Sequence, residues 1–346
     1  MKATVGELGE REVLARVLAG LGSAEAARLG PGDDCAVLGF AGDAVVTTDT
    51  MIEGPDFRLA WHDGFDLGWK LAATNLSDVA AMGARPTALT VALAVPRETP
   101  VELLERIARG LDAACRELAP GCGVVGGDLG RAPVVTASVT ALGDLEGRQP
   151  VTRSGARPGD VIAYAGPLGL AGLGLSLLFA EAADPDGTAH ARSLPGLRRA
   201  HPVEIAAQLA PTPPIGLGVR AAEAGATAMM DVSDSLSIDA DRMARASGAV
   251  LDLDAALLEA GFGAQLGASG ARVPVEAMLT GGEDHGLLAT FPAAGTLPDG
   301  FVRIGEVRAL GAESRGSRAE LPTVTLDGAP LEPRGWDPYT VRLPGA

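Results

Sequence analysis

The segment TTDTMIEGPDF at residues 47–57 decides how this chain is interpreted, because it follows an apolar run at residues 44–46 that predicts a buried strand. A hairpin would usually place Asn-Gly or Asp-Gly where such a strand ends. Here the strand is expected to end in Thr47, Thr48 and Asp49, whose side chains all carry oxygen atoms. Hydroxyl and carboxylate oxygens are ligands that Mg²⁺ and other hard cations prefer. The alternative is a polar strand end exposed to water.

Helix and strand patterns alternate on both sides of this segment. Apolar spacing and turn formers predict helices at residues 7–21, 63–83 and 101–118, and strands at residues 87–95 and 134–142. A glycine-rich link is expected to lead into the motif GGDLGR, and the residues before position 44 are expected to form a loop. Turn formers and charged residues collect at residues 143–154. Because 346 residues exceed one typical core, we expect two α/β domains at residues 1–147 and 148–346.

Composition excludes several classes of protein. The formal charge of −16 argues against a nucleic-acid or acidic membrane surface as a partner. The uncharged stretch at residues 161–180 is about long enough to span a bilayer, but Gly166 and Pro167 divide it into a predicted strand, turn and helix. Three cysteines lack the CxxC spacing of a zinc site, and the N-terminus lacks an apolar signal-peptide core. We therefore expect a cytoplasmic protein with no membrane or nucleic-acid partner.

Aspartates recur beside glycines and at the ends of apolar runs, at Asp33, Asp34, Asp49, Asp78, Asp128, Asp231 and Asp234. Asp78 is the most informative, because on its predicted helix it shares a face with Asn75 and with apolar residues. A buried carboxylate needs a partner, and separate caps and arginine pairs are one solution. The only lysines are Lys2 and Lys70, which also excludes a GxxxxGK[ST] phosphate loop. Shared divalent metal ions are therefore the interpretation that we favour.

Seven motifs follow one another along the chain: GDDCAVL, TTDTMIEGPDF, KLAATNLSDVAAMGARP, GGDLGR, TRSGARPGD, DVSDSLSID and LTGGEDHGL. Together they resemble the thiamine-monophosphate kinase family, in the superfamily of aminoimidazole ribonucleotide synthetase and selenophosphate synthetase. The resemblance implies the two-domain α/β fold of that superfamily, with the N-terminal domains of a homodimer pairing into a barrel. Residues 1–147 would then bind metal and ATP and form the dimer, and residues 148–346 would complete the ATP and substrate cleft.

The activity that the resemblance implies is ATP-dependent phosphorylation of thiamine monophosphate to thiamine diphosphate, by direct in-line transfer assisted by several Mg²⁺ ions. By motif, Mg²⁺ would be bound by Asp34, Thr47, Thr48, Asp49, Asp78, Asp128, Asp231 and Asp234, with Asp128 and Asp231 as catalytic residues. ATP would contact Gly127, Asp128, Arg153 and Ser233. The thiamine substrate would face Asp56, Glu283 and, near the C-terminus, Trp336 or Tyr339.

Several positions depart from the family's usual pattern. EGPDF stands where relatives carry EGxHF, so Asp56 replaces a histidine on the substrate side. GGDL, SDSL and GGEDHGL replace GGDT, SDGL and GGEDYEL, and we expect no role for His285. The metal aspartates are retained in all of these motifs. They favour phosphoryl transfer, and a carboxylate at position 56 would be electrostatically favourable beside a thiazolium cation.

Two alternatives remain open. The first is another ATP-dependent enzyme of the same superfamily. Selenophosphate synthetase would carry a reactive cysteine in a glycine-rich N-terminal segment, and the hydrogenase maturation relative ends in a cysteine-bearing tail, whereas this sequence ends VRLPGA. The second is a non-catalytic nucleotide-binding module, for which loss of several metal aspartates is expected.

Overall fold

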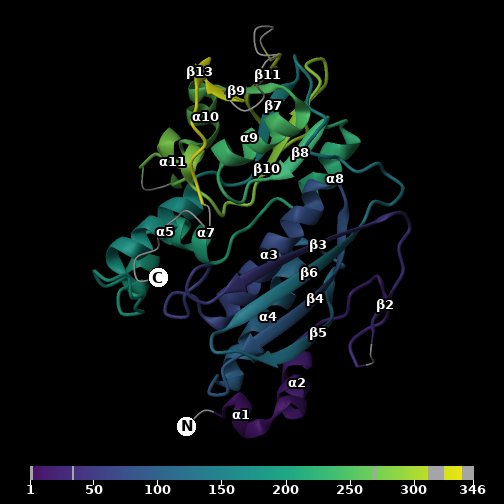
Figure 1. Ribbon diagram of the computed structural model, residues 1–346, viewed down its shortest axis with the longest axis vertical. Coiled ribbons are helices and arrows are strands. Elements are labelled where there is room, and N and C mark those ends of the chain that lie inside the picture. The colour runs from purple at the N-terminus through teal and green to yellow at the C-terminus, as the bar shows by residue number, and fades with distance from the viewer. Residues whose placement is uncertain (1–2, 33–34, 268–269, 311–322, 337–346) are drawn as a thin grey trace.

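The computed structural model describes residues 3–32, 35–267, 270–310 and 323–336. Within them the chain forms a four-stranded and a seven-stranded β-sheet, both packed with helices (Figure 1). This arrangement confirms a mixed α/β fold. The four-stranded sheet ends at Asp144 and the larger sheet begins at Val161. The division at residue 147 falls between the two sheets and stays a prediction.

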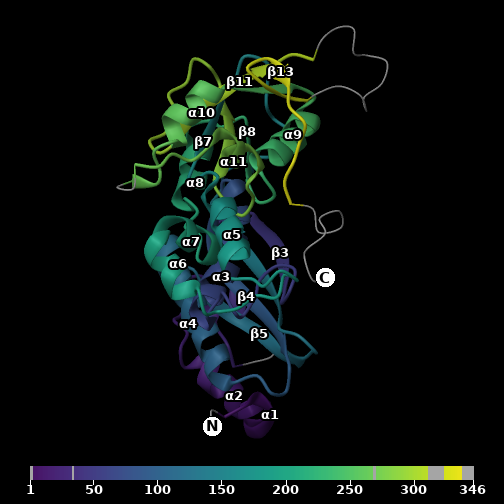
Figure 2. The same ribbon diagram turned by 90° about the vertical axis from the view of Figure 1, so that its left-hand side faces the viewer.

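The N-terminal sheet has the order β3-β6-β4-β5. Its strands are β3 (Ala44–Ile52), β4 (Arg85–Val95), β5 (Gly123–Arg131) and β6 (Thr136–Asp144). β6 runs antiparallel to β3 and β4, and β4 runs parallel to β5. Alternate residues of β3 and β6 are more deeply buried, as expected where one face of a sheet is covered. Helices α3 (Gly64–Ala81) and α4 (Val101–Leu118) cover that face, and Figure 2 shows them on one side of the strands.

The two covering helices approach each other closely at two glycines. A Cβ atom at Gly68 of α3 would lie 2.0 Å from the carbonyl oxygen of Ile107, and one at Gly110 of α4 would lie 2.1 Å from that of Phe65. Only glycine fits at either position, so these residues set the crossing. The carboxylate of Asp63 caps α3 by accepting N–H groups of its first turn. The bounds of α4 agree with the helix that its apolar spacing predicts.

Three expectations for the N-terminal part differ from the structure. The helix predicted at residues 7–21 is divided into α1 (Val5–Leu8) and α2 (Glu10–Leu18), because Gly9 between them has a φ of 75°. The expected glycine-rich link belongs largely to strand β5, where a Cβ atom at Gly127 would lie 2.0 Å from the carbonyl oxygen of Val91 on β4. Glycine in this strand therefore permits close backbone contact. The expected loop before residue 44 contains a small sheet of β1 (Ala27–Leu29) and β2 (Val37–Leu38).

The C-terminal sheet has the order β13-β12-β9-β11-β7-β10-β8. Its strands are β7 (Val161–Ala165), β8 (Ala228–Asp231), β9 (Val250–Leu253), β10 (Leu287–Phe291), β11 (Val302–Arg308), β12 (Val324–Leu326) and β13 (Ala329–Pro330). Their apolar side chains form one core with α9 (Leu236–Ser247), α10 (Ala255–Phe262) and α11 (Val275–Thr280). A second core group joins β7, β8 and β10 to α8 (Gly216–Glu223) and to Ala81 at the end of α3. The two parts of the chain therefore share buried contacts.

The uncharged stretch at residues 161–180 forms β7, a turn and α5 (Leu170–Glu181), as predicted. Helix α5 packs with α6 (Leu194–Ala200) and α7 (Pro202–Leu209) beside the N-terminal part. Trp61 Nε1 donates to the carbonyl oxygen of Ala182 at 2.8 Å, and Trp69 Nε1 donates to that of Pro211 at 2.7 Å. These bonds tie the residues that follow α5 and α7 to α3 and to the segment before it. In the part of the chain that the structure describes, no helix is both long and apolar enough to cross a membrane.

Candidate active site

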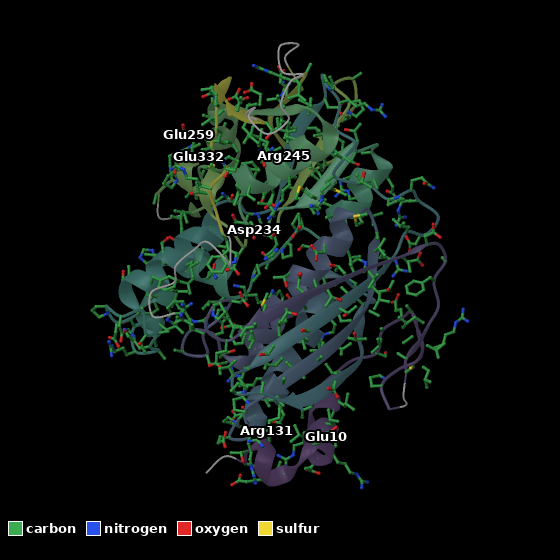
Figure 3. The ribbon with its side chains drawn as sticks, viewed as in Figure 1. Glu10, Arg131, Asp234, Arg245, Glu259 and Glu332 are labelled. Atoms are coloured by element: carbon green, nitrogen blue, oxygen red, sulfur yellow. The ribbon has the colours of Figure 1, made fainter. Side chains whose placement is uncertain are left out.

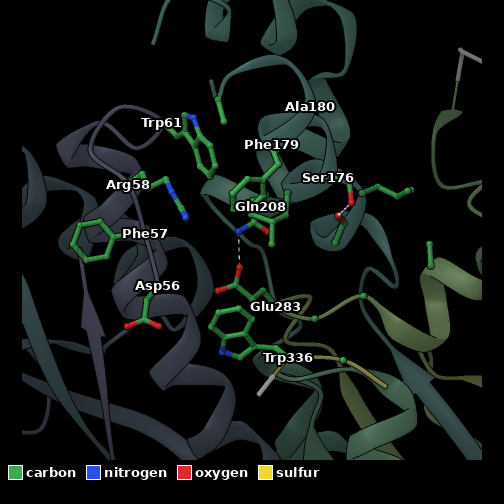
Figure 4. Close-up of a pocket in the computed structure, with 18 of the residues that line it drawn as sticks. Asp56, Phe57, Arg58, Trp61, Ser176, Phe179, Ala180, Gln208, Glu283 and Trp336 are labelled. Carbon is green, nitrogen blue, oxygen red and sulfur yellow. Dashed lines mark hydrogen bonds between the residues drawn. The ribbon is translucent and has the colours of Figure 1, made fainter. Parts of the chain in front are cut away.

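A cavity of about 960 Å³ lies where α5 and α7 meet the segment between β3 and α3. Its lining comes from residues 55–62, α5 with the turn after it, Gln208 of α7, residues 274–283 and residues 335–336. Figure 4 shows Glu283 between Gln208 and Trp336, with Asp56 and Arg58 across from them. A cavity of this volume accommodates a small organic molecule.

Three of the four residues predicted to face the thiamine substrate line this cavity: Asp56, Glu283 and Trp336. Tyr339 lies outside the described residues. Asp56 Oδ2 accepts the N–H of Ile52 at 2.7 Å, which turns the carboxylate back toward the end of β3. Burial raises the pKa of Asp56, and the nearby charge of Glu283 adds to the effect. The two carboxylates therefore make this side of the cavity favourable for a cation.

Trp336 is brought to the cavity by the chain that follows β13. Its N–H donates to the carbonyl oxygen of Asp234 at 3.1 Å, and Ser235 Oγ donates to the carbonyl oxygen of Arg334 at 2.7 Å. A Cβ atom at Gly335 would lie 2.4 Å from the carbonyl oxygen of Asp234. Glycine is therefore required for this close passage, which fixes the indole beside the cavity.

Glu283 is held by two residues that the sequence analysis did not select, Lys70 and Gln208. Lys70 is fully buried in α3, and its Nζ donates to Glu283 Oε2 and to the carbonyl oxygen of Gln208, each at 3.0 Å. Gln208 Nε2 donates to the same Glu283 oxygen. Burial alone would raise the pKa of Glu283, but Lys70 and Gln208 outweigh it and lower the pKa. Glu283 is therefore ionised, and Lys70 has the acidic partner that a buried ammonium needs.

Arg58 lies between two aromatic walls of the cavity. Its guanidinium carbon is 4.7 Å from the ring centroid of Trp61 and 4.7 Å from that of Phe179. The two rings meet edge to face, with centroids 5.1 Å apart. The ring faces attract the cation, which offsets part of the desolvation that lowers the pKa of Arg58.

A second feature beside the cavity is the acidic group, which we define as Asp49 on β3, Asp78 on α3 and Asp231 at the end of β8. Thr47 Oγ1 donates to Asp78 Oδ2 at 2.9 Å, and Ser77 Oγ donates to Asp231 Oδ2 at 3.0 Å. Strand β3, helix α3 and strand β8 thus each contribute one carboxylate. The acidic group is consequently formed by both parts of the chain.

The carboxylates of the acidic group disturb one another electrostatically. Burial, followed by the charges of Asp231 and Asp49, raises the pKa of Asp78 to about 7. Burial, followed by the charge of Asp231, raises the pKa of Asp49. Neither Asp49 nor Asp78 forms an ion pair with Lys or Arg among the residues described. Carboxylate oxygens that repel one another beside a threonine hydroxyl are the type of donor that a hard divalent cation takes.

His285, for which no role was expected, contacts the acidic group. Its Nδ1 lies 3.3 Å from Asp231 Oδ2, and its side chain is buried. Burial would lower the pKa of His285, but the hydrogen bond and charge of Asp231 raise it. Both His285 and Glu283 have positive φ angles, of 54° and 66°. Such angles are uncommon outside glycine, so the segment at residues 283–285 has a backbone set by its surroundings.

The expectation that Thr47, Thr48 and Asp49 form one ligand set at a strand end is wrong in its geometry. β3 continues to Ile52, so the three residues lie within the strand. Side chains alternate between the two faces of a strand, so Thr47 and Asp49 face the helices and Thr48 faces outward. Thr48 Oγ1 is hydrogen-bonded to Thr140 Oγ1 at 2.8 Å on that outer face.

Asp128 is likewise not brought to the acidic group within one chain. Its register partner on β4 is Ala92, which pairs with Ser138 on β6, and Ser138 pairs with Thr50 on β3. These paired residues lie on the outer face of the sheet. Asp128 is exposed there on edge strand β5, whereas Asp49 lies on the opposite edge strand, β3. Among the described residues, no three side chains of His, Cys, Asp or Glu are placed to hold one metal ion. The fold of a single chain therefore leaves the predicted metal set incomplete.

Asp234 has an arginine partner, which is the alternative to a metal ion that the sequence left open. Arg242 Nη1 lies 2.6 Å from Asp234 Oδ2 and 2.7 Å from Asp239 Oδ1. Asp239 also accepts the N–H of Ser233 at 3.1 Å, which shapes the turn after β8. Burial is the main cause that raises the pKa of Asp239 to about 6. Figure 3 shows Asp234 near the junction of the two parts, whereas Arg131, at the end of β5, lies at the far end.

The remaining predicted residues do not line the cavity. Arg153 is exposed, and its carbonyl oxygen accepts a hydrogen bond from Ser247 Oγ at 3.0 Å. Gly127 packs against β4, as described above. Asp34 lies outside the described residues. The structure thus gathers Asp56, Glu283 and Trp336 at the cavity and Thr47, Asp49, Asp78 and Asp231 at the acidic group.

Comparison with known proteins first defines a class. The family described as AIR synthase related protein, N-terminal domain, matches residues 32–145. These residues contain the four-stranded sheet with α3 and α4, and two of the three carboxylates of the acidic group. The sheet, its helices and the acidic positions are therefore those of a protein related to AIR synthase.

More similar proteins narrow the class to one family. The thiamine-monophosphate kinase of Mycobacterium tuberculosis is 41% identical over 314 residues, which cover 88% of this chain and 86% of that protein. The crystal structure of thiamine-monophosphate kinase from Stenotrophomonas maltophilia K279a is 31% identical, with a TM-score of 0.69 over 93% of this chain and 96% of that one. A structure described as AaThiL complexed with AMPPCP and TMP is 28% identical, with a TM-score of 0.69 over 96% of each chain. The chain belongs to the thiamine-monophosphate kinase family.

Proposed function

We propose that this protein transfers the γ-phosphoryl group of ATP to thiamine monophosphate and forms thiamine diphosphate. Membership of the family supports this activity, as does the likeness to the structure solved with AMPPCP and TMP. The observation that carries the proposal is the segment at residues 283–285. Glu283 faces the cavity, and His285 contacts Asp231 in the acidic group. One short segment thus joins a pocket for an organic group to carboxylates suited to phosphate chemistry.

The cavity provides what the thiamine part of the substrate requires. Phe179 and Trp336 line the cavity and supply aromatic surface for its rings, whereas Trp61 is buried against Phe179 and Arg58. The carboxylates of Asp56 and Glu283 face the position of a thiazolium cation and stabilise its charge. Because Lys70 keeps Glu283 ionised and Gln208 fixes its direction, this charge is present before the substrate binds.

Transfer of a phosphoryl group from ATP to another phosphate is opposed by the repulsion between their negative charges. The acidic group offers ligands for a cation that would reduce this repulsion. Mg²⁺, when bound, supplies the charge neutralisation that lets the acceptor phosphate approach ATP. We propose as its ligands Asp34, Thr47, Asp49, Asp78, Asp128, Asp231 and Asp234, with Asp128 and Asp231 closest to the reaction. ATP would contact Gly127, Asp128, Arg153 and Ser233. Because the acceptor phosphate is already ionised near neutral pH, these residues position the reactants for direct in-line transfer without a general base.

We also propose that the active protein is a homodimer that pairs through the outer face of the four-stranded sheet. The helices cover only the other face (Figure 2). On the outer face, Val46 is 69% exposed and Ile52 is 39% exposed, next to hydroxyl pairs such as Thr50 with Ser138. Exposed apolar side chains on a flat sheet are a surface that a second copy fits through two-fold symmetry. Pairing through this face would place Asp128 at the interface, where its carboxylate can contribute to a site shared with the second copy.

The decisive test of the activity is an assay of purified protein with ATP, Mg²⁺ and thiamine monophosphate, followed by separation of the thiamine phosphates. Thiamine and a precursor of aminoimidazole ribonucleotide serve as alternative acceptors. We expect thiamine diphosphate from the monophosphate alone. Absence of this product, with ATP binding intact, would instead support a non-catalytic nucleotide-binding module. Turnover of the other precursor would support a different enzyme of the superfamily.

The dimer is tested by changing one exposed valine on each of two surfaces. Val46→Lys places a charge on the outer face of β3, and Val203→Lys places one on α7, where the valine is 38% exposed. We expect light scattering to show a dimer for the wild type and for Val203→Lys, and a monomer for Val46→Lys. A wild-type monomer at assay concentrations contradicts the proposed dimer and the contribution of Asp128 to a second copy, whereas the proposed reaction is tested separately by the assay above.

A further inference from the structure

The segment that brings Trp336 to the cavity is held by two buried serine hydroxyls. We call residues 331–336 the strap. Ser235 is 0% exposed and Ser237 is 1% exposed, and their Oγ atoms donate to the carbonyl oxygen of Arg334 at 2.7 and 2.8 Å. Buried hydroxyl groups need partners, and here one residue of the strap is the partner of both.

The hydrogen bonds of the two hydroxyls form a closed set. Each hydroxyl has one proton, and both protons are donated to the Arg334 carbonyl oxygen, which has two lone pairs. Ser237 Oγ in turn accepts the N–H of Arg334 at 3.0 Å, and Ser235 Oγ accepts that of Ile238 at 3.1 Å. Both backbone polar groups of Arg334 are therefore satisfied by the serine pair. We call Ser235 and Ser237 the serine dock.

The serine dock supports the part of the strap that reaches the cavity. The strap begins at Leu331, whose N–H donates to the carbonyl oxygen of Val324 at 3.0 Å, and the next two residues are exposed. Arg334 then meets the serine dock, and Trp336, two residues further on, lines the cavity with its side chain partly exposed. The position of the indole therefore depends on a contact outside the cavity.

We propose that Ser235 and Ser237 are positioning residues for the acceptor substrate, because they hold the Trp336 indole where it packs against a ring of thiamine monophosphate. This inference rests on the proposed function. A binding surface that is in place for only part of the time weakens the apparent affinity in proportion to that time. The serine dock follows β8 and Asp231, so it also sets the indole relative to the acidic group.

The first test is Ser237→Ala, which removes two of the hydrogen bonds and leaves Ser235 as the cap of α9. We expect KM for thiamine monophosphate to rise roughly 5- to 20-fold, with kcat and KM for ATP changed less than about twofold. Ser237→Thr keeps the hydroxyl and should restore KM. An unchanged KM in Ser237→Ala would overturn the inference.

Thr87→Val is the matched control for this test. Thr87 is 1% exposed and also donates its hydroxyl to a backbone carbonyl oxygen, that of Leu142 at 3.0 Å, but within the N-terminal sheet. We expect it to lower stability without raising KM. A rise in KM equal to that of Ser237→Ala would show a general effect of lost buried hydrogen bonds and would overturn the inference.

A double-variant cycle tests whether Ser237 acts through Trp336. Trp336→Ala changes a partly exposed side chain, so we expect it to fold and to raise KM at least as much as Ser237→Ala does. Adding Ser237→Ala to Trp336→Ala should raise KM no further, because the strap then carries no ring to position. A normal KM in Trp336→Ala, or a full further rise in the double variant, would contradict the proposed role.

Tryptophan fluorescence gives a readout that needs no substrate. Trp61 is 1% exposed and Trp69 is 8% exposed, whereas Trp336 is partly exposed, so acrylamide should quench mainly Trp336. We expect stronger quenching in Ser237→Ala, and no such increase when Trp336→Phe is also present. Equal quenching in Ser237→Ala and the wild type would count against the serine dock. A wild type that forms no thiamine diphosphate would instead fail the proposed function, so the two failures are distinguished.

Discussion

In the cavity, Lys70, Glu283 and Arg58 find partners within the chain, whereas Asp49 and Asp78 of the acidic group face other carboxylates. Lys70 is paired with Glu283, and Arg58 lies against two aromatic rings. Asp49 and Asp78, by contrast, face other carboxylates, and the pKa of Asp78 rises to about 7. The positive charges of the cavity are thus compensated in the folded chain, whereas Asp56 remains favourable for a cation.

The cavity is therefore suited to recognising the substrate, and the acidic group is suited to the chemistry of phosphoryl transfer. A preformed cavity binds its ligand without first reorganising, which favours affinity and specificity. Carboxylates that repel one another become favourable only when a cation arrives, so the acidic group is completed by what it binds. Because Asp128 lies on the outer face of the sheet, one chain alone does not supply the full set of proposed ligands.

The largest expected effect is on turnover. Asp78→Asn removes a carboxylate from the acidic group, and we expect kcat to fall roughly 100- to 1,000-fold, because stabilisation of charge in the transition state is lost. KM for thiamine monophosphate should change little, since the cavity is untouched. Asp299→Asn is the matched control, because that carboxylate is fully exposed and lies outside both regions. A variant Asp78→Asn with normal kcat would contradict the separation of the two regions.

The next prediction asks whether Asp128 acts on the second copy. Asp49→Asn and Asp128→Asn should each be inactive alone. If each site takes Asp49 from one chain and Asp128 from its partner, a mixed dimer of the two variants contains one intact site. Random mixing makes half of the dimers mixed, so about a quarter of wild-type activity is expected after co-expression. No recovery in dimers verified as mixed would place both aspartates in the same chain's site.

Within the cavity, Lys70→Met leaves Glu283 without its cation. We expect a loss of roughly 1–3 kcal/mol in the free energy of unfolding, measured with urea, because a largely buried carboxylate becomes unpaired. The double variant Lys70→Met, Glu283→Gln should recover much of this stability, since the charge is then removed as well. Equal stability of the single and double variants would show that the ion pair contributes nothing.

The last expected effect, small for each pH unit, is a pH dependence of stability in the absence of metal. Because the pKa of Asp78 is about 7 in the folded chain and 3.8 is its ordinary value, the folded state holds a proton that the unfolded state loses between these pH values. Stability from this group therefore falls as pH rises from about 4 to 7, by at most about 1.4 kcal/mol per pH unit. Urea titrations in EDTA should show this fall, and Asp78→Asn or added Mg²⁺ should reduce it. An unchanged slope in Asp78→Asn would exclude Asp78 as its origin.

Local patterns in the sequence were sufficient where periodicity alone decides structure. The apolar spacing at residues 101–118 predicts α4 with its bounds, and Gly166 with Pro167 predicts the turn between β7 and α5. The glycines of β5 do not predict a strand, because a run of glycines is typical of a link between elements. They form a strand because Gly127 packs directly against the backbone of β4, which only the fold reveals.

The candidate site was likewise predictable only in part, because some of its residues belong to motifs and others depend on partners far away in the sequence. Ordered motifs indicated Asp49, Asp78, Asp56, Glu283 and Trp336, which the structure places at the acidic group and the cavity. Lys70 and Gln208 were not selected, because their partner Glu283 is 213 and 75 residues away in sequence. A lone lysine among apolar residues of a predicted helix was a signal that a buried acidic partner exists. Strand alternation likewise would have separated Thr48 from its neighbours.

The positive φ angles at Glu283 and His285 have a consequence for attempts to evolve a new substrate preference. A substitution that relaxes this strained tripeptide to reshape the cavity would also move the imidazole away from Asp231. Selectivity and turnover are therefore linked mechanically and cannot be optimised one at a time through this loop. Laboratory evolution toward other acceptors should accumulate its first successful changes elsewhere on the cavity wall, for example along α5, where the backbone is regular helix.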